Sequence, residues 1–207
     1  MAIKNIVFDM ANVLMLYDKN YYLDRCGITD SEERTIILRD VLKSVEWIKM
    51  DRGLLTRPEA MEIFRKRVPE HVEKYLDYIV RGWEMDIVPV PGMKELVAEL
   101  KENGYGIYLL SNAGYDHYDY WLRIPGSELF DEVLFSCDVH QLKPEHEIYE
   151  TFLSRFGLKA EECVFIDDMN YNIESACLLG FNGIVFFNDM ARLRHELAGF
   201  GVRCRTE

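Results

Sequence analysis

Short apolar runs that end in polar residues recur along this chain, and the first lies in residues 4–13. Ile6, Val7 and Phe8 form a continuous apolar run that ends at Asp9. A run without alternation is typical of a strand buried on both faces of a parallel sheet. Asp9 is then expected where the strand leaves the sheet, which is the edge where open α/β sheets bind ligands. Asp9 is therefore a candidate site residue, although capping of the following turn is an alternative role.

The pattern becomes helical from about residue 17 to residue 85. Apolar residues with helical spacing predict a helix over 31–45; they are Ile36, Ile37, Val41, Leu42 and Val45. Thr56 and Glu59 have the spacing of a capping box, with Pro58 in the first turn of a helix that reaches Phe64. A further helix is expected over 71–83. No strand pattern interrupts this block, which predicts a separate all-helical unit.

Helices and strands alternate in the rest of the chain, after the breaker sequence Pro89-Val90-Pro91-Gly92. Helices are expected at 93–102, 115–122, 147–156 and 172–179, and strands at 107–110, 133–136, 163–166 and 184–187. Such alternation is typical of right-handed βα units that build a parallel sheet. The predicted fold class is therefore α/β: a doubly wound parallel sheet from residues 1–16 and 90–207, with a small all-helical cap domain at 17–89.

Three further pairs of residues later in the chain are candidates for the same site. Ser111-Asn112 and Asp167-Asp168 each come directly after a predicted strand, and Lys143-Pro144 precedes a predicted helix. Each pair alone has an ordinary explanation, such as capping of a helix or an exposed lysine. Because the carboxyl ends of parallel strands meet at one edge, we expect these side chains to converge with Asp9 in one crevice.

These residue types suit phosphoryl transfer when they are combined. Asp9 supplies a nucleophile, and Asp167 with Asp168 supplies the hard oxygen ligands that Mg²⁺ prefers. Ser111 and nearby backbone N–H groups suit phosphate oxygens, and Lys143 supplies a positive charge. A carboxylate about 4 Å from one phosphate charge is repelled by roughly 4 kcal/mol at an effective dielectric constant of 20. A divalent metal ion and a lysine are what could overcome this repulsion.

The order of these four groups resembles the haloacid dehalogenase-like (HAD) hydrolase superfamily. The resemblance covers the whole chain, since the helical block is similar to the helical C1 cap of subfamily IA. It implies an aspartyl-phosphate intermediate on Asp9, with Asp9 and Lys143 as catalytic residues. The resemblance also implies that Ser111, Asn112 and Lys143 bind the phosphoryl group. It implies that Mg²⁺ is bound by Asp9, the Ala11 carbonyl, Asp168 and Asp167. Asn172 would orient Lys143 or a metal-bound water.

Position 11 departs from the family pattern. Most phosphatases of this family carry a second Asp two residues after the nucleophile as general acid and base, and this chain has Ala11. In this respect the chain is similar to a subgroup that includes α-D-glucose-1-phosphate phosphatases. A proton would then come from water or from a more distant acid such as Asp18 or His117. We therefore expect a preference for esters with good leaving groups, such as aryl, acyl and anomeric sugar phosphates.

The resulting hypothesis is a Mg²⁺-dependent phosphatase that acts on a phosphate monoester of a small metabolite, with sugar phosphates among the candidates. One alternative is a haloacid dehalogenase, which also lacks the second Asp but needs no metal, so that Asp167 and Asp168 argue against it. Another is a phosphate-binding or regulatory protein whose catalysis has decayed at Ala11. The persistence of the other motifs argues against such decay.

Composition limits the partners and the compartment. Among 207 residues, 49% are hydrophobic and 13% are aromatic, which favours a folded globule. A formal net charge of −12 disfavours nucleic acid and anionic membranes as partners, so we expect a small phosphorylated metabolite. The five cysteines form no Cys-x-x-Cys pair, which is consistent with a reducing compartment. Without a signal-peptide or membrane-spanning pattern, a cytoplasmic monomer or homodimer is expected.

Overall fold

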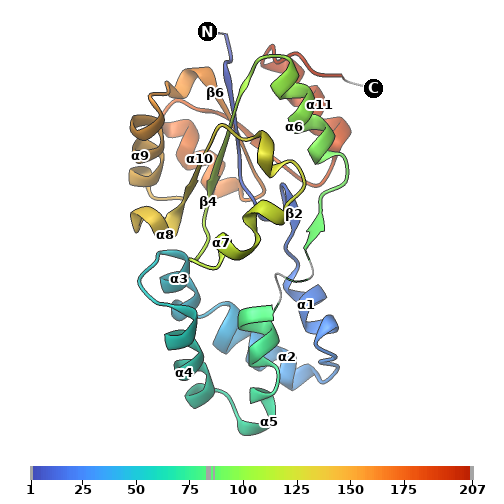
Figure 1. The fold of residues 1–207 in the computed structure, drawn as a ribbon, viewed down its shortest axis with the longest axis vertical. Helices are drawn as coiled ribbons and strands as arrows, with labels where there is room; N and C mark the ends of the chain where they lie inside the picture. The colour runs from blue at the N-terminus through green and yellow to red at the C-terminus, as the bar shows by residue number, and fades with distance from the viewer. Residues whose placement is uncertain (1, 83–84, 86, 206–207) are drawn as a thin grey trace.

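A five-stranded parallel sheet forms the centre of the larger part of the molecule (Figure 1). The computed structural model describes residues 2–82, 85 and 87–205. The strand order is β5-β4-β1-β6-β7, and the strands are β5 (Glu132–Phe135), β4 (Gly106–Ser111), β1 (Asn5–Phe8), β6 (Cys163–Asp167) and β7 (Asn182–Val185). The first strand of the chain therefore lies in the middle of the sheet. This arrangement confirms the predicted α/β class with a parallel sheet.

The register of the three central strands places the predicted site residues at one edge. Phe8 of β1 lies opposite Leu109 of β4 and Ile166 of β6. Asp9 therefore leaves the sheet level with Asp167, and its N–H donates to the Ile166 carbonyl at 2.9 Å. The sequence predicted this convergence at the carboxyl edge.

Helices cover both faces of the sheet. On one face lie α6 (Met93–Glu102) and α11 (Met190–Gly199), and on the other lie α9 (His146–Phe156) and α10 (Asn170–Leu178) (Figure 1). Ile6 and Phe8 belong to the first apolar cluster and Val7 to the second, and all three are fully buried. Burial on both faces explains why the strand reads as a continuous apolar run and not as an alternating one.

All regular elements within described residues 19–82 are helical, and they form the lower part of Figure 1. They are α1 (Lys19–Arg25), α2 (Ser31–Ile37), the π-helix η1 (Leu38–Leu42), α3 (Val45–Asp51), α4 (Arg57–Arg67), α5 (Glu70–Glu73) and the π-helix η2 (Tyr78–Gly82). The helix predicted over 31–45 is confirmed over 31–42, where η1 directly continues α2, but it ends before Val45 because Ser44 caps a new helix: its hydroxyl accepts from the Trp47 N–H. The predicted capping box of Thr56 and Glu59 is confirmed.

The helical block is joined to the sheet by two short paired strands. Met15 and Leu16 form β2 (Met15–Leu16), which pairs antiparallel with β3 (Val88–Pro89). The chain therefore enters and leaves the block at adjacent points. No strand pattern is present in the sequence here, where Pro89-Val90-Pro91-Gly92 predicts a boundary.

Several other segments differ from the expected ones. The strand expected at 184–187 begins earlier, because Asn182 and Gly183 pair with Val164 and Phe165 of β6. The helix expected at 71–83 is replaced by α5 and η2, and Trp83 lies outside the described residues. The helix expected at 115–122 is shorter. The remaining short helices are α7 (His117–Tyr120), η4 (Trp121–Arg123), η5 (Ser127–Leu129), α8 (Ser136–Val139) and η6 (Ala160–Glu162).

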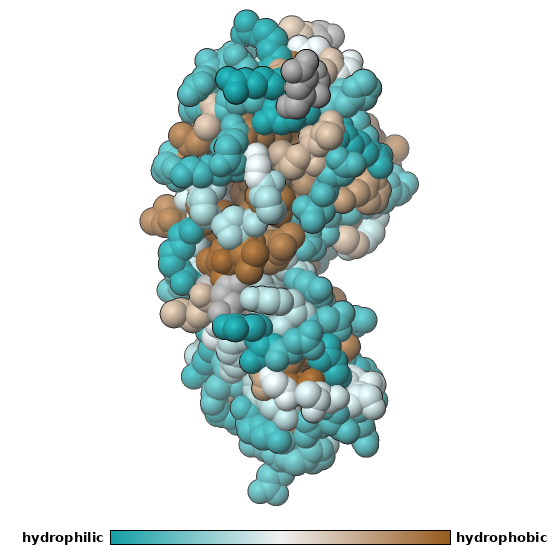
Figure 2. Space-filling model, turned by 90° about the vertical axis from the view of Figure 1, so that its right-hand side faces the viewer, coloured by the Kyte–Doolittle hydropathy of each residue, from teal (hydrophilic) through white to brown (hydrophobic). Residues whose placement is uncertain are grey.

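The surface is largely hydrophilic on the side seen in Figure 2, where apolar side chains gather just above the narrow junction of the two parts. None of the helices in the described part of the chain has both the length and the apolar character needed to cross a membrane.

Candidate active site

A buried lysine lies between two buried aspartates at the carboxyl edge of the sheet. Lys143 Nζ is 2.8 Å from Asp9 Oδ1 and 2.6 Å from Asp167 Oδ2, and it also donates to the Leu110 carbonyl at 3.0 Å. The Lys143 side chain is only 1% exposed. Burial lowers the pKa of Lys143, but the charges of Asp167 and Asp9 outweigh it and raise that pKa above its ordinary value. The lysine is therefore a fixed positive charge beside Asp9.

Asp9 keeps unused capacity for a ligand. Its contact with Lys143 is an ion pair, and Asp9 Oδ1 has no well-aligned hydrogen-bond donor in the described part of the chain. Burial raises the pKa of Asp9 to about 6; Lys143 opposes this shift, and Asp167 and Asp168 reinforce it. An ionised carboxylate can accept several contacts, so Asp9 Oδ1 can bind a further group besides Lys143. These features suit an attacking carboxylate that faces a cationic or phosphorylated ligand.

Asp167 is fully occupied by protein donors. Besides Lys143, it accepts from Asn172 Nδ2 at 3.0 Å on each oxygen and from the Met169 N–H at 2.8 Å. Tyr149 in turn donates to the Asn172 carbonyl at 2.9 Å. Asn172 therefore contacts Asp167 and not Lys143 itself, so that it positions the lysine through the aspartate. Its predicted role as an orienting residue stays a prediction, and this contact supplies a route for it.

Three carboxylates are close enough to share a metal ion. Ligand oxygens of Asp9, Asp167 and Asp168 all lie within 4.8 Å of one another. Asp168 is fixed by Asn12, whose Nδ2 donates to Asp168 Oδ2 at 3.0 Å. Hard oxygen donors are the ligands that Mg²⁺ takes in proteins, and Asp9 Oδ1, which has an ion pair with Lys143 but no aligned hydrogen bond from the described residues, fits such an ion. Because Asp167 is saturated by other donors, Asp9 and Asp168 have the greater free capacity.

The two residues at the end of β4 differ in their contacts. The Ser111 hydroxyl is buried and has no hydrogen-bond partner among the described residues, as expected of a group that awaits a phosphate oxygen. The Asn112 side chain is already used: its Oδ1 accepts from the Lys143 N–H at 2.9 Å, and its Nδ2 donates to the Lys143 carbonyl at 3.0 Å. Binding of the substrate by Asn112 stays a prediction, whereas its contact with Lys143 is observed.

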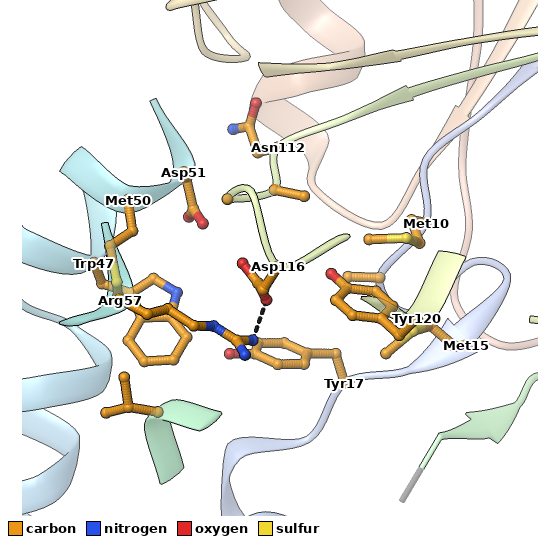
Figure 3. A pocket seen from close by; sticks show the side chains of 14 residues that line it. Met10, Met15, Tyr17, Trp47, Met50, Asp51, Arg57, Asn112, Asp116 and Tyr120 are labelled. Carbon is orange, nitrogen blue, oxygen red and sulfur yellow. Dashed lines mark hydrogen bonds and ion pairs between the residues drawn. The ribbon is translucent and has the colours of Figure 1, made fainter. Parts of the chain in front are cut away.

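A cavity of about 80 Å³ lies between the loops that follow β1 and β4 and the helical block (Figure 3). Side chains from both parts line it: Met10, Ala11, Met15, Tyr17, Trp47, Met50, Asp51, Arg57, Val80, Asn112, Ala113, Gly114, Asp116 and Tyr120. Arg57 and Asp116 form an ion pair across it. The lining of the cavity is thus mainly aromatic and apolar, with a few charged groups.

Two acids considered from the sequence lie elsewhere. Asp18 is exposed and caps α1 by accepting from the Asn20 N–H, and His117 is buried with its ring stacked 3.6 Å from Phe135. Burial lowers the pKa of His117. Neither residue is among those that line the cavity. Asp51, Arg57 and Asp116 are not predictable as site residues from the sequence, because none of them directly follows a predicted strand.

Several curated proteins are similar in sequence to this chain. The "Pyrophosphatase PpaX" of Listeria innocua is 30% identical over 57% of this chain and 57% of its own length. The "Flavin mononucleotide hydrolase 1" of Arabidopsis thaliana is 25% identical over 75% of this chain and 62% of its own length. The "Sesquiterpene phosphatase astK" of Aspergillus oryzae is 23% identical over 91% of this chain and 92% of its own length. The chain thus spans little more than half the length of the pyrophosphatases that it matches.

Solved structures share the fold. The HAD family enzyme bt-2542 of Bacteroides thetaiotaomicron, solved with magnesium and inorganic phosphate, superposes with a TM-score of 0.72 at 23% identity, over 93% of this chain and 99% of that one. The L-2-haloacid dehalogenase of Xanthobacter autotrophicus superposes with a TM-score of 0.64 at 20% identity, over 87% of this chain and 76% of the dehalogenase chain. The sequence model of the haloacid dehalogenase-like hydrolases matches residues 3–176. The chain therefore belongs to the haloacid dehalogenase-like hydrolase family.

Proposed function

We propose that this hydrolase is a magnesium-dependent phosphatase that cleaves a phosphate monoester of a small metabolite, with Asp9 as the nucleophile. The observation that carries the proposal is the placement of Lys143 between Asp9 and Asp167. Asp168 lies close by, and the buried Ser111 hydroxyl has no hydrogen-bond partner among the described residues. This set combines an attacking carboxylate, a fixed cation, a phosphate-oxygen donor and metal ligands. Phosphatases and pyrophosphatases among the relatives support the same class of reaction.

The chain's own residues divide the reaction among them. A carboxylate oxygen of Asp9 attacks phosphorus, the bond from phosphorus to the ester oxygen breaks, and water later cleaves the aspartyl phosphate to release phosphate. Lys143 and Ser111 hold the phosphoryl oxygens, while Asn112, Asp167 and Asn172 fix the lysine. When bound, Mg²⁺ would be held by Asp9, the Ala11 carbonyl and Asp168, with Asp167 beside it, and would neutralise charge on the phosphoryl group.

We further propose that residues 17–89 act as a cap that selects the substrate. Tyr17, Trp47 and Arg57 extend from this segment into the cavity, whereas the proposed nucleophile belongs to the sheet (Figure 3). A substrate would therefore be cleaved at the edge of the sheet and recognised by the helices. Specificity in such a fold depends on side chains of this kind.

The proposal is tested by phosphate release from 4-nitrophenyl phosphate and a panel of sugar phosphates, acyl phosphates and nucleotides. Activity should require Mg²⁺, and Asp9→Asn should lower turnover by at least about 10³-fold, since it removes the attacking charge. Asp18→Asn, which alters an exposed carboxyl outside the cavity, is the matched control. Near wild-type turnover in Asp9→Asn would refute the assignment. Chelator-insensitive halide release from 2-chloropropionate would instead favour a dehalogenase.

A further inference from the structure

The cavity contains an acid that no role described so far uses. Ala11 lines the cavity and has no group that could protonate a leaving oxygen. The carboxyls that line the same cavity are those of Asp51 and Asp116, and Asp116 forms an ion pair with Arg57. The Asp51 side chain, by contrast, forms no hydrogen bond or ion pair within the part of the chain that the structure describes. Figure 3 shows its carboxyl directed from α3 into the cavity.

The backbone of Asp51 is fixed against the sheet-containing part. The Ser136 hydroxyl donates to the Asp51 carbonyl at 2.5 Å, and the His140 ring Nδ1 lies 2.9 Å from the Arg52 carbonyl. Arg52 also forms an ion pair with Glu145. Since Asp51 ends α3, these contacts hold the end of that helix, and with it the carboxyl, over the cavity. The position of the carboxyl is therefore determined by both parts of the molecule.

The surroundings of Asp51 favour the protonated acid. Burial and the negative charge of Asp116 raise the pKa of Asp51 to about 8, while Lys19 opposes the shift. The other titratable or charged groups that face the cavity are Tyr17, Arg57 and Tyr120. A carboxylic acid that keeps its proton near neutral pH and lines the same cavity as Ala11 has the properties of a general acid.

We propose that Asp51 protonates the leaving oxygen of the substrate, which Ala11 cannot do; the proposal rests on the phosphatase function proposed above. As Asp9 attacks phosphorus, the electron pair of the breaking P–O bond passes to the ester oxygen, which takes the proton of the Asp51 carboxyl. Asp51 becomes a carboxylate. It then accepts a proton from the water that cleaves the aspartyl phosphate, so that both groups return to their initial state. The acid thus comes from the helical block and not from the loop after β1.

This proposal changes the substrate preference expected from the sequence. With Ala11 alone, rates should fall steeply as the leaving group becomes more basic. With Asp51 as the acid, alkyl phosphates become substrates and the dependence on leaving-group pKa becomes shallow in the wild type. A positioned general acid typically contributes about 10²–10⁴ in rate. We therefore expect Asp51→Asn to slow phosphoryl transfer from an alkyl phosphate by at least about 10²-fold, and from 4-nitrophenyl phosphate less than threefold.

The test measures single-turnover rates with Mg²⁺ for 4-nitrophenyl, phenyl and alkyl phosphates in the wild type, Asp51→Asn and the control Asp18→Asn. Asp51→Asn should steepen the dependence on leaving-group pKa, and the control should not. A second measurement needs no variant: wild-type rates on the alkyl ester should fall as pH rises above about 8, while rates on 4-nitrophenyl phosphate should not. Addition of Ala11→Asp to Asp51→Asn should restore a shallow dependence.

Other outcomes overturn the proposal. An equal loss of rate for every ester in Asp51→Asn would make Asp51 a substrate-binding residue, and an unchanged slope would exclude it as the acid. In either case wild-type cleavage of 4-nitrophenyl phosphate leaves the phosphatase function standing. A wild type that cleaves no phosphate ester at all would refute the phosphatase function and Asp51's role with it.

Discussion

The side-chain amide of Asn112 forms two hydrogen bonds with the backbone of Lys143, one with its N–H at 2.9 Å and one with its carbonyl at 3.0 Å. Asn112 follows β4, whereas Lys143 lies in the loop before α9. The amide therefore ties the loop to the edge of the sheet, at the place where the lysine side chain must reach Asp9. Two reciprocal bonds fix both the position and the orientation of this backbone segment.

Replacement of Asn112 by Ala should weaken this connection. Each lost hydrogen bond costs about 0.5–1.5 kcal/mol, so the free energy of unfolding should fall by about 1–3 kcal/mol. A displaced Lys143 should slow phosphoryl transfer by about 10–100-fold. Denaturant titration and single-turnover kinetics measure the two effects, with Asn170→Ala as a control, since Asn170 is exposed and its side chain donates to Glu174. A rise in KM at unchanged kcat would show that Asn112 binds substrate.

Metal binding should be visible without any assay of activity. An ion that binds the folded state alone raises its stability, by about 2.7 kcal/mol at one hundred times the dissociation constant. Addition of Mg²⁺ should therefore raise the Tm of the wild type, and Asp168→Asn should reduce that rise. Asp189→Asn is the control, because Asp189 caps α11 and lies outside the carboxylate cluster. An equal rise in all three proteins would place the ion elsewhere.

The pH dependence of stability offers a second test of the surroundings of Asp51. Its folded-state pKa of about 8 lies above the ordinary value of 3.8, so the folded protein holds this proton more tightly than the unfolded chain. The resulting stability is present at low pH and is lost as pH rises from about 4 through about 8. Asp51→Asn cannot ionise, and it should therefore reduce the fall in Tm between pH 5 and pH 8.5. An unchanged fall would show that the Asp51 carboxyl ionises as an exposed one does.

Gly53 marks a close approach between the helical block and the sheet-containing part. Its φ is +71°, and an added Cβ would lie 2.5 Å from the Cys137 carbonyl oxygen. Gly27 has nearly the same φ, +70°, but a Cβ added there would meet no atom of a non-adjacent described residue within 4 Å. Gly27→Ala should cost about 1–2 kcal/mol of stability from backbone strain alone. Gly53→Ala should cost more and should also reduce the rate on alkyl phosphates, because it displaces the end of α3. Equal costs in thermal unfolding would contradict the close contact.

Features fixed by local sequence were predictable. Continuous apolar runs revealed β1, β4 and β6, because burial on both faces leaves no polar positions. The polar residues after those strands gave the carboxyl-edge cluster, since topology alone makes Asp9 and Asp167 meet. The capping box at Thr56 was also readable, as it depends on a spacing of three residues.

Features that depend on tertiary contacts were not predictable. The break at Ser44 interrupts a pattern that remains helical in its spacing, so only the capping bond reveals it. The pairing of Met15 with Pro89 joins distant segments and has no local signal. Asp51 is one acid among many in an acidic chain, and only the docking of α3 against Ser136 places it in the cavity. The sequence could therefore show what Ala11 lacks but not which residue replaces it.

The pairing of β2 with β3 also affects how the chain folds. The central sheet requires Asn5 of β1 to meet Gly106 of β4, and the helical block lies between them in the sequence. Closing an unstructured loop of roughly 70 residues costs about 4 kcal/mol of conformational entropy, and this cost grows with the length of the loop. A helical block that forms first brings Leu16 beside Val88 and removes most of that length. We thus expect pulsed hydrogen exchange during refolding to protect the amides of α4 before those of β1, whereas the reverse order would mean that the sheet forms across an open loop.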